Sequence, residues 1–240
     1  RDTAVVSDLL TWNVLASITP IPRLQIGLRL PVVYVNGEGI NLSTGGPSAG
    51  LSTPAVGDVA LEAKVRIYGK PDAALVIAGA ADIAAPVGHA SAENAYVGNS
   101  SPVTGGIRAI IDVKADNLVI LGNLRGLFRE SASLGNTTVG PEFRYGVALG
   151  YAVRRGETTF TPFVEGFGAT RFSVKNGTNA FELGGGLQIK PPQGPGSSQV
   201  GISLSGGAGV LSGVGVPVAR AVVGLSFSFE GVADSDGDGV

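Results

Sequence analysis

Alternation of apolar and polar residues, sustained over runs of about 9–13 residues, restricts the fold of this chain more than any other feature. In the run 142–154, Phe143, Tyr145 and Val147 fall on one side, whereas Arg144 and several small residues fall on the other. Because successive side chains of a β-strand point to opposite faces, this period of two predicts a strand with one apolar face.

Eleven such runs follow one another along the chain, and no segment shows helical periodicity of comparable strength. A tilted strand needs about 9–11 residues to cross a bilayer, and most of these runs are at least that long. We therefore predict an all-β fold, an antiparallel transmembrane β-barrel of about twelve strands, eleven of them within this chain. The runs are 8–20, 23–35, 57–69, 72–85, 105–115, 117–130, 138–155, 158–172, 179–190, 199–211 and 218–231.

The composition favours a membrane barrel over a soluble one. Hydrophobic residues make up 44% of the chain and charged residues 15%, and the mean hydropathy is +0.30. A soluble domain averages about 25% charged residues. A soluble β-sandwich or soluble barrel also alternates and stays the alternative, but soluble strands average about 5–6 residues.

The second face of the predicted strands carries charges of both signs, which we expect to point into the barrel. Two interpretations are open. In the one we favour, the charges pair across the interior and fill or narrow it; in the other, they line a water-filled pore. The expected interior charges are Arg29, Glu62, Lys64, Arg66, Asp82, Arg108, Asp112, Lys114, Arg125, Glu142, Arg144, Glu165, Glu182 and Lys190.

The lengths of the connections predict the orientation of the barrel. Short connections lie near 20–22, 69–72, 115–117 and 155–157, and they alternate with longer ones that begin with 36–56 and 86–104. Outer-membrane barrels have short periplasmic turns and longer outer loops, so the short class is expected to face the periplasm. Because single-chain bacterial barrels have an even number of strands, we expect a twelfth strand from upstream of Arg1 or from another chain.

The chain ends in an acidic segment, which we expect to form a linker over 232–240 after a barrel over 1–231. Asp234, Asp236 and Asp238 alternate in a DxDxDG pattern, and Ca²⁺ takes six to eight oxygen ligands of this kind. The sequence stops before the glutamate that would complete an EF-hand loop. Two interpretations therefore stay open, the start of a Ca²⁺ site and a solvated linker without a metal.

Four parts of the sequence resemble OmpA-like outer-membrane proteins. They are 23–31, 57–64, 207–210 with 215–217 and Arg220, and 234–239. In one group of that family, calcium-binding repeats of the thrombospondin type 3 kind follow the barrel and precede a peptidoglycan-binding domain. The resemblance implies that Asp234, Asp236 and Asp238 begin the first calcium repeat, and that peptidoglycan is contacted by a domain absent from these 240 residues.

Several other functions have little support in the sequence. The net charge of −2 and the lack of a basic run argue against nucleic-acid binding. His89 lies near Ser91 and Glu93, but no GxSxG, HExxH, Walker A or CxxC motif occurs, so we do not expect an enzyme.

These observations predict a structural barrel of the bacterial outer membrane that contacts lipid and is joined to the cell wall through a calcium-repeat linker. A diffusion channel for small solutes is the first alternative. A scaffold subunit, in contact with other envelope proteins, is the second.

Overall fold

The computed structural model describes residues 7–37, 51–88, 103–134, 137–172, 179–192, 199–211, 213 and 215–229, and these residues form a curved antiparallel sheet and one short hairpin. The strands are β1 (Asp8–Ile21), β2 (Leu24–Gly37), β3 (Leu51–Val56), β4 (Val59–Tyr68), β5 (Leu75–Ala85), β6 (Thr104–Ala115), β7 (Leu118–Phe128), β8 (Ala132–Leu134), β9 (Thr137–Val139), β10 (Glu142–Tyr151), β11 (Val153–Arg155), β12 (Thr158–Thr170), β13 (Asn179–Lys190), β14 (Gln199–Leu211) and β15 (Arg220–Ser228).

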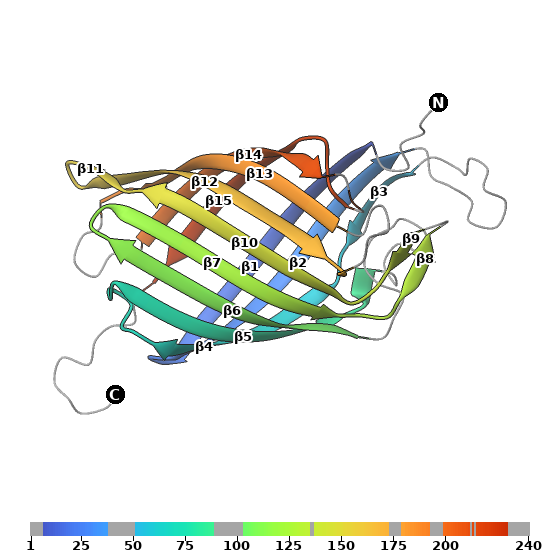
Figure 1. Ribbon diagram of the computed structural model, residues 1–240, viewed down its shortest axis with the longest axis horizontal. Helices are drawn as coiled ribbons and strands as arrows, with labels where there is room; N and C mark the ends of the chain where they lie inside the picture. Colours follow the sequence, from blue (N-terminus) through green and yellow to red (C-terminus); the bar gives the residue numbers. More distant parts are fainter. Residues whose placement is uncertain are drawn as a thin grey trace.

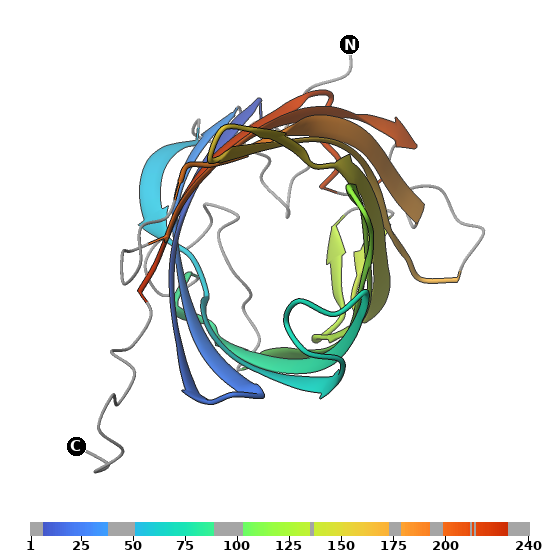
Figure 2. The same cartoon turned by 90° about the vertical axis from the view of Figure 1, so that its left-hand side faces the viewer.

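The sheet is a meander in which each strand pairs with the next main strand along the chain. Its order is β1-β2-β4-β5-β6-β7-β10-β12-β13-β14-β15, and it curls around a central axis (Figures 1 and 2). The predicted all-β antiparallel barrel and its eleven runs are therefore confirmed. The main strands form one sheet that curves on itself, whereas the sandwich alternative would need two stacked sheets.

Two short additions lie where the sequence predicted loops. Strand β3 pairs with the outer half of β2, and Gly57 N donates a hydrogen bond to Pro31 O at 2.8 Å, so β3 and β4 together follow β2 along most of its length. Strands β8 and β9 form a separate hairpin within 132–139. The predicted run 138–155 is divided, because β10 ends at Tyr151 and β11 begins at Val153.

The two faces of the sheet differ in the way that the alternation predicted. Large apolar side chains on the convex face are exposed, among them Leu61, Leu124 and Val164. The small or apolar residues that are buried, such as Ala80 and Leu127, lie on the opposite face with the charges. Most burial in the described strands is thus on the concave side, with Gly166 of β12 as an exception on the convex face. None of the described segments forms a helix with the length and apolar character that crossing a membrane requires.

The connections at the two ends of the sheet differ in length. At one end, β6 and β7 are joined by Asp116 and Asn117, and Asp116 has a φ of 51°. Two-residue hairpin turns need positive φ, which aspartate tolerates better than most residues. Gly156, with a φ of 60°, has a similar place before β12. The longer connections follow β2, β5, β7, β12 and β14 at the other end, in the predicted alternation (Figure 1). The connection 191–198 after β13 is an exception that the sequence also indicates, because it is as long as the connection after β12 but lies at the end with the short turns.

Strands β1 and β15 form the two ends of the pairing order within the described residues. Because eleven main strands alternate in direction between them, β1 and β15 run the same way. A strand running the opposite way could therefore pair with both edges. Every described residue of β1 is exposed, including Trp12 at 55%. The expected twelfth strand fits this geometry and stays a prediction.

Gly168 of β12 lies under the Tyr145 side chain, and replacing it with alanine should loosen the sheet. A Cβ atom there would lie 2.7 Å from Tyr145 Oη and closer still to the backbone oxygen of Ala180. We expect Gly168→Ala to cost about 1–3 kcal/mol, measured as a lower temperature for loss of the folded band in electrophoresis. The control is Gly27→Ala, whose Cβ would have 3.8 Å to its nearest neighbour. Equal stability of the two variants would contradict this packing.

Candidate functional site

The charges predicted to lie inside the barrel share one face of the sheet. Glu62 lies opposite Asp82, and Arg125 lies opposite both Arg108 and Arg144. The strand registers place the remaining predicted charges on the same face. These are Arg29, Lys64, Arg66, Asp112, Lys114, Glu142, Glu165, Glu182 and Lys190. The charges thus line the concave wall, which we call the lumen face.

Two ion pairs of the lumen face each reach across an intervening strand. Arg125 of β7 contacts Asp82 of β5 at 2.5 Å, and Arg108 of β6 contacts Glu62 of β4. Strands two apart are about 10 Å from each other, a separation that a long arginine can span. The residue of β6 opposite Asp82 is Gly106, where a Cβ atom would lie 2.7 Å from Arg125 Nε. The small residue lets the arginine lie along the wall.

The same arrangement recurs near the end of the chain. Arg220 of β15 contacts Glu182 of β13 at 3.0 Å, across β14. The residues of β14 opposite them are Gly207 and Gly209. The Arg220 guanidinium also lies 5.5 Å from the ring centre of Phe167, a distance suited to a cation–π contact.

Glu142 is the most heavily paired acid of the lumen face. Its carboxylate contacts Arg144 at 2.5 Å, Arg129 at 3.0 Å and Arg171 at 3.9 Å, and its side chain is 8% exposed. Burial lowers the pKa of the Arg129 guanidinium, and the nearby Glu142 carboxylate opposes that shift. Arg129 Nε also donates to Gly140 O at 2.9 Å. This cluster ties the outer ends of β7, β10 and β12 together.

The ion pairs leave part of the lumen face solvated. The side chains of Arg108 and Glu62 are each 32% exposed, and that of Arg144 is 45% exposed. Lys114 and Asp112 form a longer contact of 3.6 Å. Among the described residues, five of the predicted charges take no part in an ion pair: Arg29, Lys64, Arg66, Glu165 and Lys190.

Three arginines of these clusters were missed by the sequence analysis of the interior. Arg129 and Arg171 continue the inward periods of β7 and β12, four residues after Arg125 and six after Glu165. Arg220 opens β15 opposite Gly207. The first two lie within the predicted runs 117–130 and 158–172, so applying the period of two to the whole of each run would have identified them.

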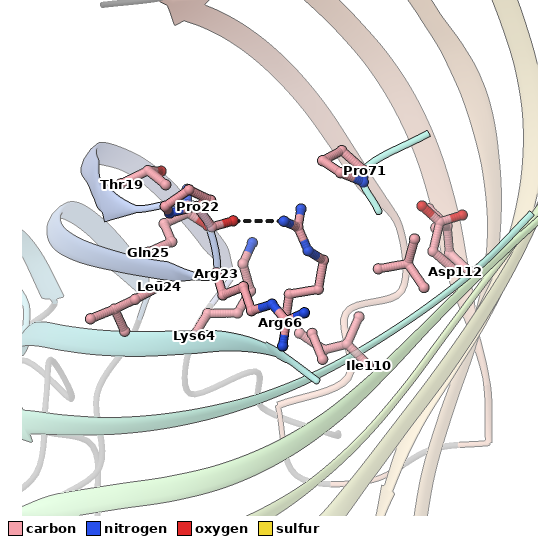
Figure 3. Close-up of a pocket in the computed structure, with 13 residues that line it drawn as sticks. Thr19, Pro22, Arg23, Leu24, Gln25, Lys64, Arg66, Pro71, Ile110 and Asp112 are labelled. Carbon is pink, nitrogen blue, oxygen red and sulfur yellow. Dashed lines mark hydrogen bonds between the residues drawn. The ribbon is translucent and has the colours of Figure 1, made fainter. Parts of the chain in front are cut away.

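A cavity opens on the lumen face at the end of the barrel with the short turns (Figure 3). Its volume is about 350 Å³, and it lies between the β1–β2 turn and strands β4, β6 and β7. In Figure 3, Lys64 and Arg66 extend from β4 towards Pro22, and Arg66 Nη2 donates to Pro22 O at 2.7 Å. Asp112 and Pro71 lie on the other side of the opening.

The expected metal ligands Asp234, Asp236 and Asp238 lie outside the described residues, as does His89. Within the described ranges, no three His, Cys, Asp or Glu side chains come together as a metal site requires. The calcium-binding tail and the absence of catalysis therefore both stay predictions.

The family model described as putative MetA-pathway of phenol degradation matches residues 24–217, from the start of β2 to the connection before β15. No curated protein matches the chain. The OmpA-like resemblance and its calcium repeats rest on the sequence stretches given above and stay predictions.

Removing the charge of Glu142 should weaken the barrel, because Arg129, Arg144 and Arg171 would lose their shared partner. Breaking a buried ion pair costs about 3–5 kcal/mol, and the partial exposure of Arg144 reduces this, so we expect Glu142→Gln to cost about 1–3 kcal/mol. Urea unfolding in lipid vesicles would measure the loss. Glu165→Gln is the matched control, since Glu165 has no described ion pair. An equal effect of both changes would show that the cluster does not stabilise the barrel.

Proposed function

Since the chain belongs to the family of the putative MetA-pathway of phenol degradation, we propose that it is an outer-membrane barrel through which small aromatic solutes diffuse. The fold and the family are both compatible with an outer-membrane protein. The family description motivates the class of solute. The proposal rests on the two faces of the sheet.

The convex face supports insertion in lipid. Large apolar side chains are exposed on it from β1 to β15, with Leu28, Ile107 and Phe227 as examples. A soluble protein rarely leaves so extensive an apolar surface in water. In a bilayer the same surface faces hydrocarbon, and the hydrogen-bond ladder between strands satisfies the backbone.

One observation on the lumen face supports a channel. The ion pairs of Arg125 with Asp82 and of Arg220 with Glu182 reach along the wall, from one strand to the next but one, rather than across the interior. Charges paired in this way are neutralised without filling the space inside the ring of strands. The partial exposure of Arg108 and Glu62 agrees with a hydrated interior.

The orientation follows from the connections. The short turns at the β6–β7 and β11–β12 ends would face the periplasm, and the longer connections would face outwards. The cavity beside Pro22 and Pro71 would then lie at the periplasmic mouth. The alternative of an anchor to the cell wall depends on residues after Phe229, and it stays a prediction with the scaffold alternative.

Insertion in lipid predicts that an arginine is tolerated on one face of β7 and not on the other. Leu124 lies on the convex face and is 52% exposed, whereas Leu121 lies on the lumen face and is 45% exposed. We expect Leu124→Arg to cost about 2–4 kcal/mol, because it places a charge in hydrocarbon near the bilayer midplane. Leu121→Arg should cost less than about 1 kcal/mol. Both are measured by urea unfolding in vesicles, and equal losses would contradict the assignment of the faces.

The channel is tested with the folded protein in planar lipid bilayers and in vesicles. We expect discrete openings of small conductance, and release of a trapped aromatic sulfonate, which the lipid alone retains, faster than from vesicles that contain the boiled protein. A hydrated interior that is not filled by side chains accounts for both results. The absence of openings, together with sulfonate release equal to that of the boiled control, would refute the channel.

A further inference from the structure

The cavity at the short-turn end of the lumen has two chemically different parts. One part holds three cationic side chains, those of Arg23, Lys64 and Arg66. We call this cavity, lined by these three residues and their apolar neighbours, the cationic cavity. Figure 3 shows Lys64 and Arg66 directed into the space between the β1–β2 turn and Pro71.

The three cations are not neutralised by described neighbours. None of them forms an ion pair among the described residues, whereas Oδ2 of the nearby acid Asp112 lies 3.6 Å from Lys114 Nζ. Arg66 uses Nη2 to donate to Pro22 O, while its buried Nε and the buried Oδ1 of Asp112 have no hydrogen-bond partner in the structure. A buried donor without a partner is destabilising, so an acceptor that reaches Arg66 Nε would be stabilising.

The opposite part of the cavity combines aliphatic side chains with one acid. Its aliphatic residues come from β5, β6 and β7 and are Val76, Ala78, Ile110 and Leu121, and Asp112 of β6 lies on the same side. Leu121 and Ile110 belong to the lumen face, although most of their neighbours there are small or charged. The cavity volume of about 350 Å³ lies at the lower end of the range of small-ligand sites, about 300–1,000 Å³.

We propose that the cationic cavity binds a small aromatic carboxylate, an inference that rests on the proposed channel and specifies one class of solute. The carboxylate accepts hydrogen bonds from Lys64 and Arg66, which charge assistance strengthens. The ring lies against Ile110 and Leu121. Inorganic phosphate would gain nothing from the apolar wall, and a neutral phenol would gain little from the cations. The combination therefore favours a ring that bears one negative charge.

The first experiment measures binding of benzoate to the folded barrel in detergent, by calorimetry or ligand-observed NMR. Benzoate should bind at least tenfold more tightly than either phenol or inorganic phosphate. Lys64→Gln and Arg66→Gln should each weaken benzoate binding by about tenfold or more, since a charge-assisted hydrogen bond contributes about 1.5–3 kcal/mol. Heat-modifiable migration verifies that each variant is folded.

Arg144→Gln is the matched control, because it removes an exposed lumen cation at the other end of the barrel, away from the cationic cavity. Its affinity for benzoate should equal that of the unaltered protein. Equal weakening by Arg144→Gln and Lys64→Gln would show a general charge effect and overturn the site. Equal affinity for phenol and benzoate would also overturn it.

Binding and conduction are measured separately, so the two proposals can fail separately. Selective benzoate binding in a barrel that does not conduct would leave the site intact and refute the channel. Conduction without benzoate binding would refute the site and leave the channel intact. In bilayers, addition of benzoate on the short-turn side should reduce the current of the unaltered protein and not that of Lys64→Gln. An equal reduction in both proteins would overturn the site.

Discussion

The continuous ladder of backbone hydrogen bonds from β1 to β15 is the constraint on which the rest of this structure depends. Inside a bilayer no water satisfies a free backbone N–H or C=O, so each strand must pair on both sides. Once pairing occupies the directions within the sheet, side chains can point only to the convex or to the lumen face. The period of two in the sequence, the exposed apolar surface and the charged interior all follow from that geometry.

A second constraint is that the charges of the interior must be neutralised. The structure pairs acids with arginines whose side chains pass over small residues. An arginine that reaches over one strand to an acid is helped by a small residue between them, as Gly106 allows for Arg125, and Gly207 lies opposite Arg220 in the neighbouring strand. The abundance of glycine in the strands, 38 residues in the chain, thus serves side-chain packing as well as curvature. Pairing along the wall reconciles two requirements that the sequence analysis treated as alternatives, paired charges and an open interior.

The sequence predicted the fold better than the contacts within it. Alternation is a local property, so eleven strands and the face of each charge could be derived from spacing. Which arginine meets which acid depends on the stagger between strands, and that is a property of the assembled sheet. The pairing of Arg108 with Glu62 of β4, instead of with Asp82 of the adjacent strand β5, illustrates this. Strands β3, β8 and β9 were missed because they have three to six residues, too few to establish a period.

The resemblance to OmpA-like proteins and the family match depend on different parts of the chain. The anchoring role that the resemblance implies depends on Asp234 to Gly239, after the last strand. The family match, in contrast, ends at residue 217. Function lies in sites carried on a fold, so a barrel and the segment that follows it can vary independently. The predicted anchoring role therefore depends on residues outside the family match, whereas the proposed passage of solutes depends on the barrel.

Charge is distributed unevenly along the lumen, and this gives the two mouths different chemistry. The acids Glu62, Asp82, Glu142 and Glu182 are each paired with arginine. Towards the short turns, Arg66 instead donates to Pro22 O at 2.7 Å, and Lys114, which also lies 3.6 Å from Asp112, donates to Pro71 O at 2.9 Å. A carbonyl satisfies a donor without cancelling its charge, and Arg23, Lys64 and Arg66 form no ion pair among the described residues, so this end has more uncompensated positive charge than the paired clusters. A solute moving through the barrel would pass from balanced charge to excess positive charge, and an anion would be held most strongly near the short-turn end.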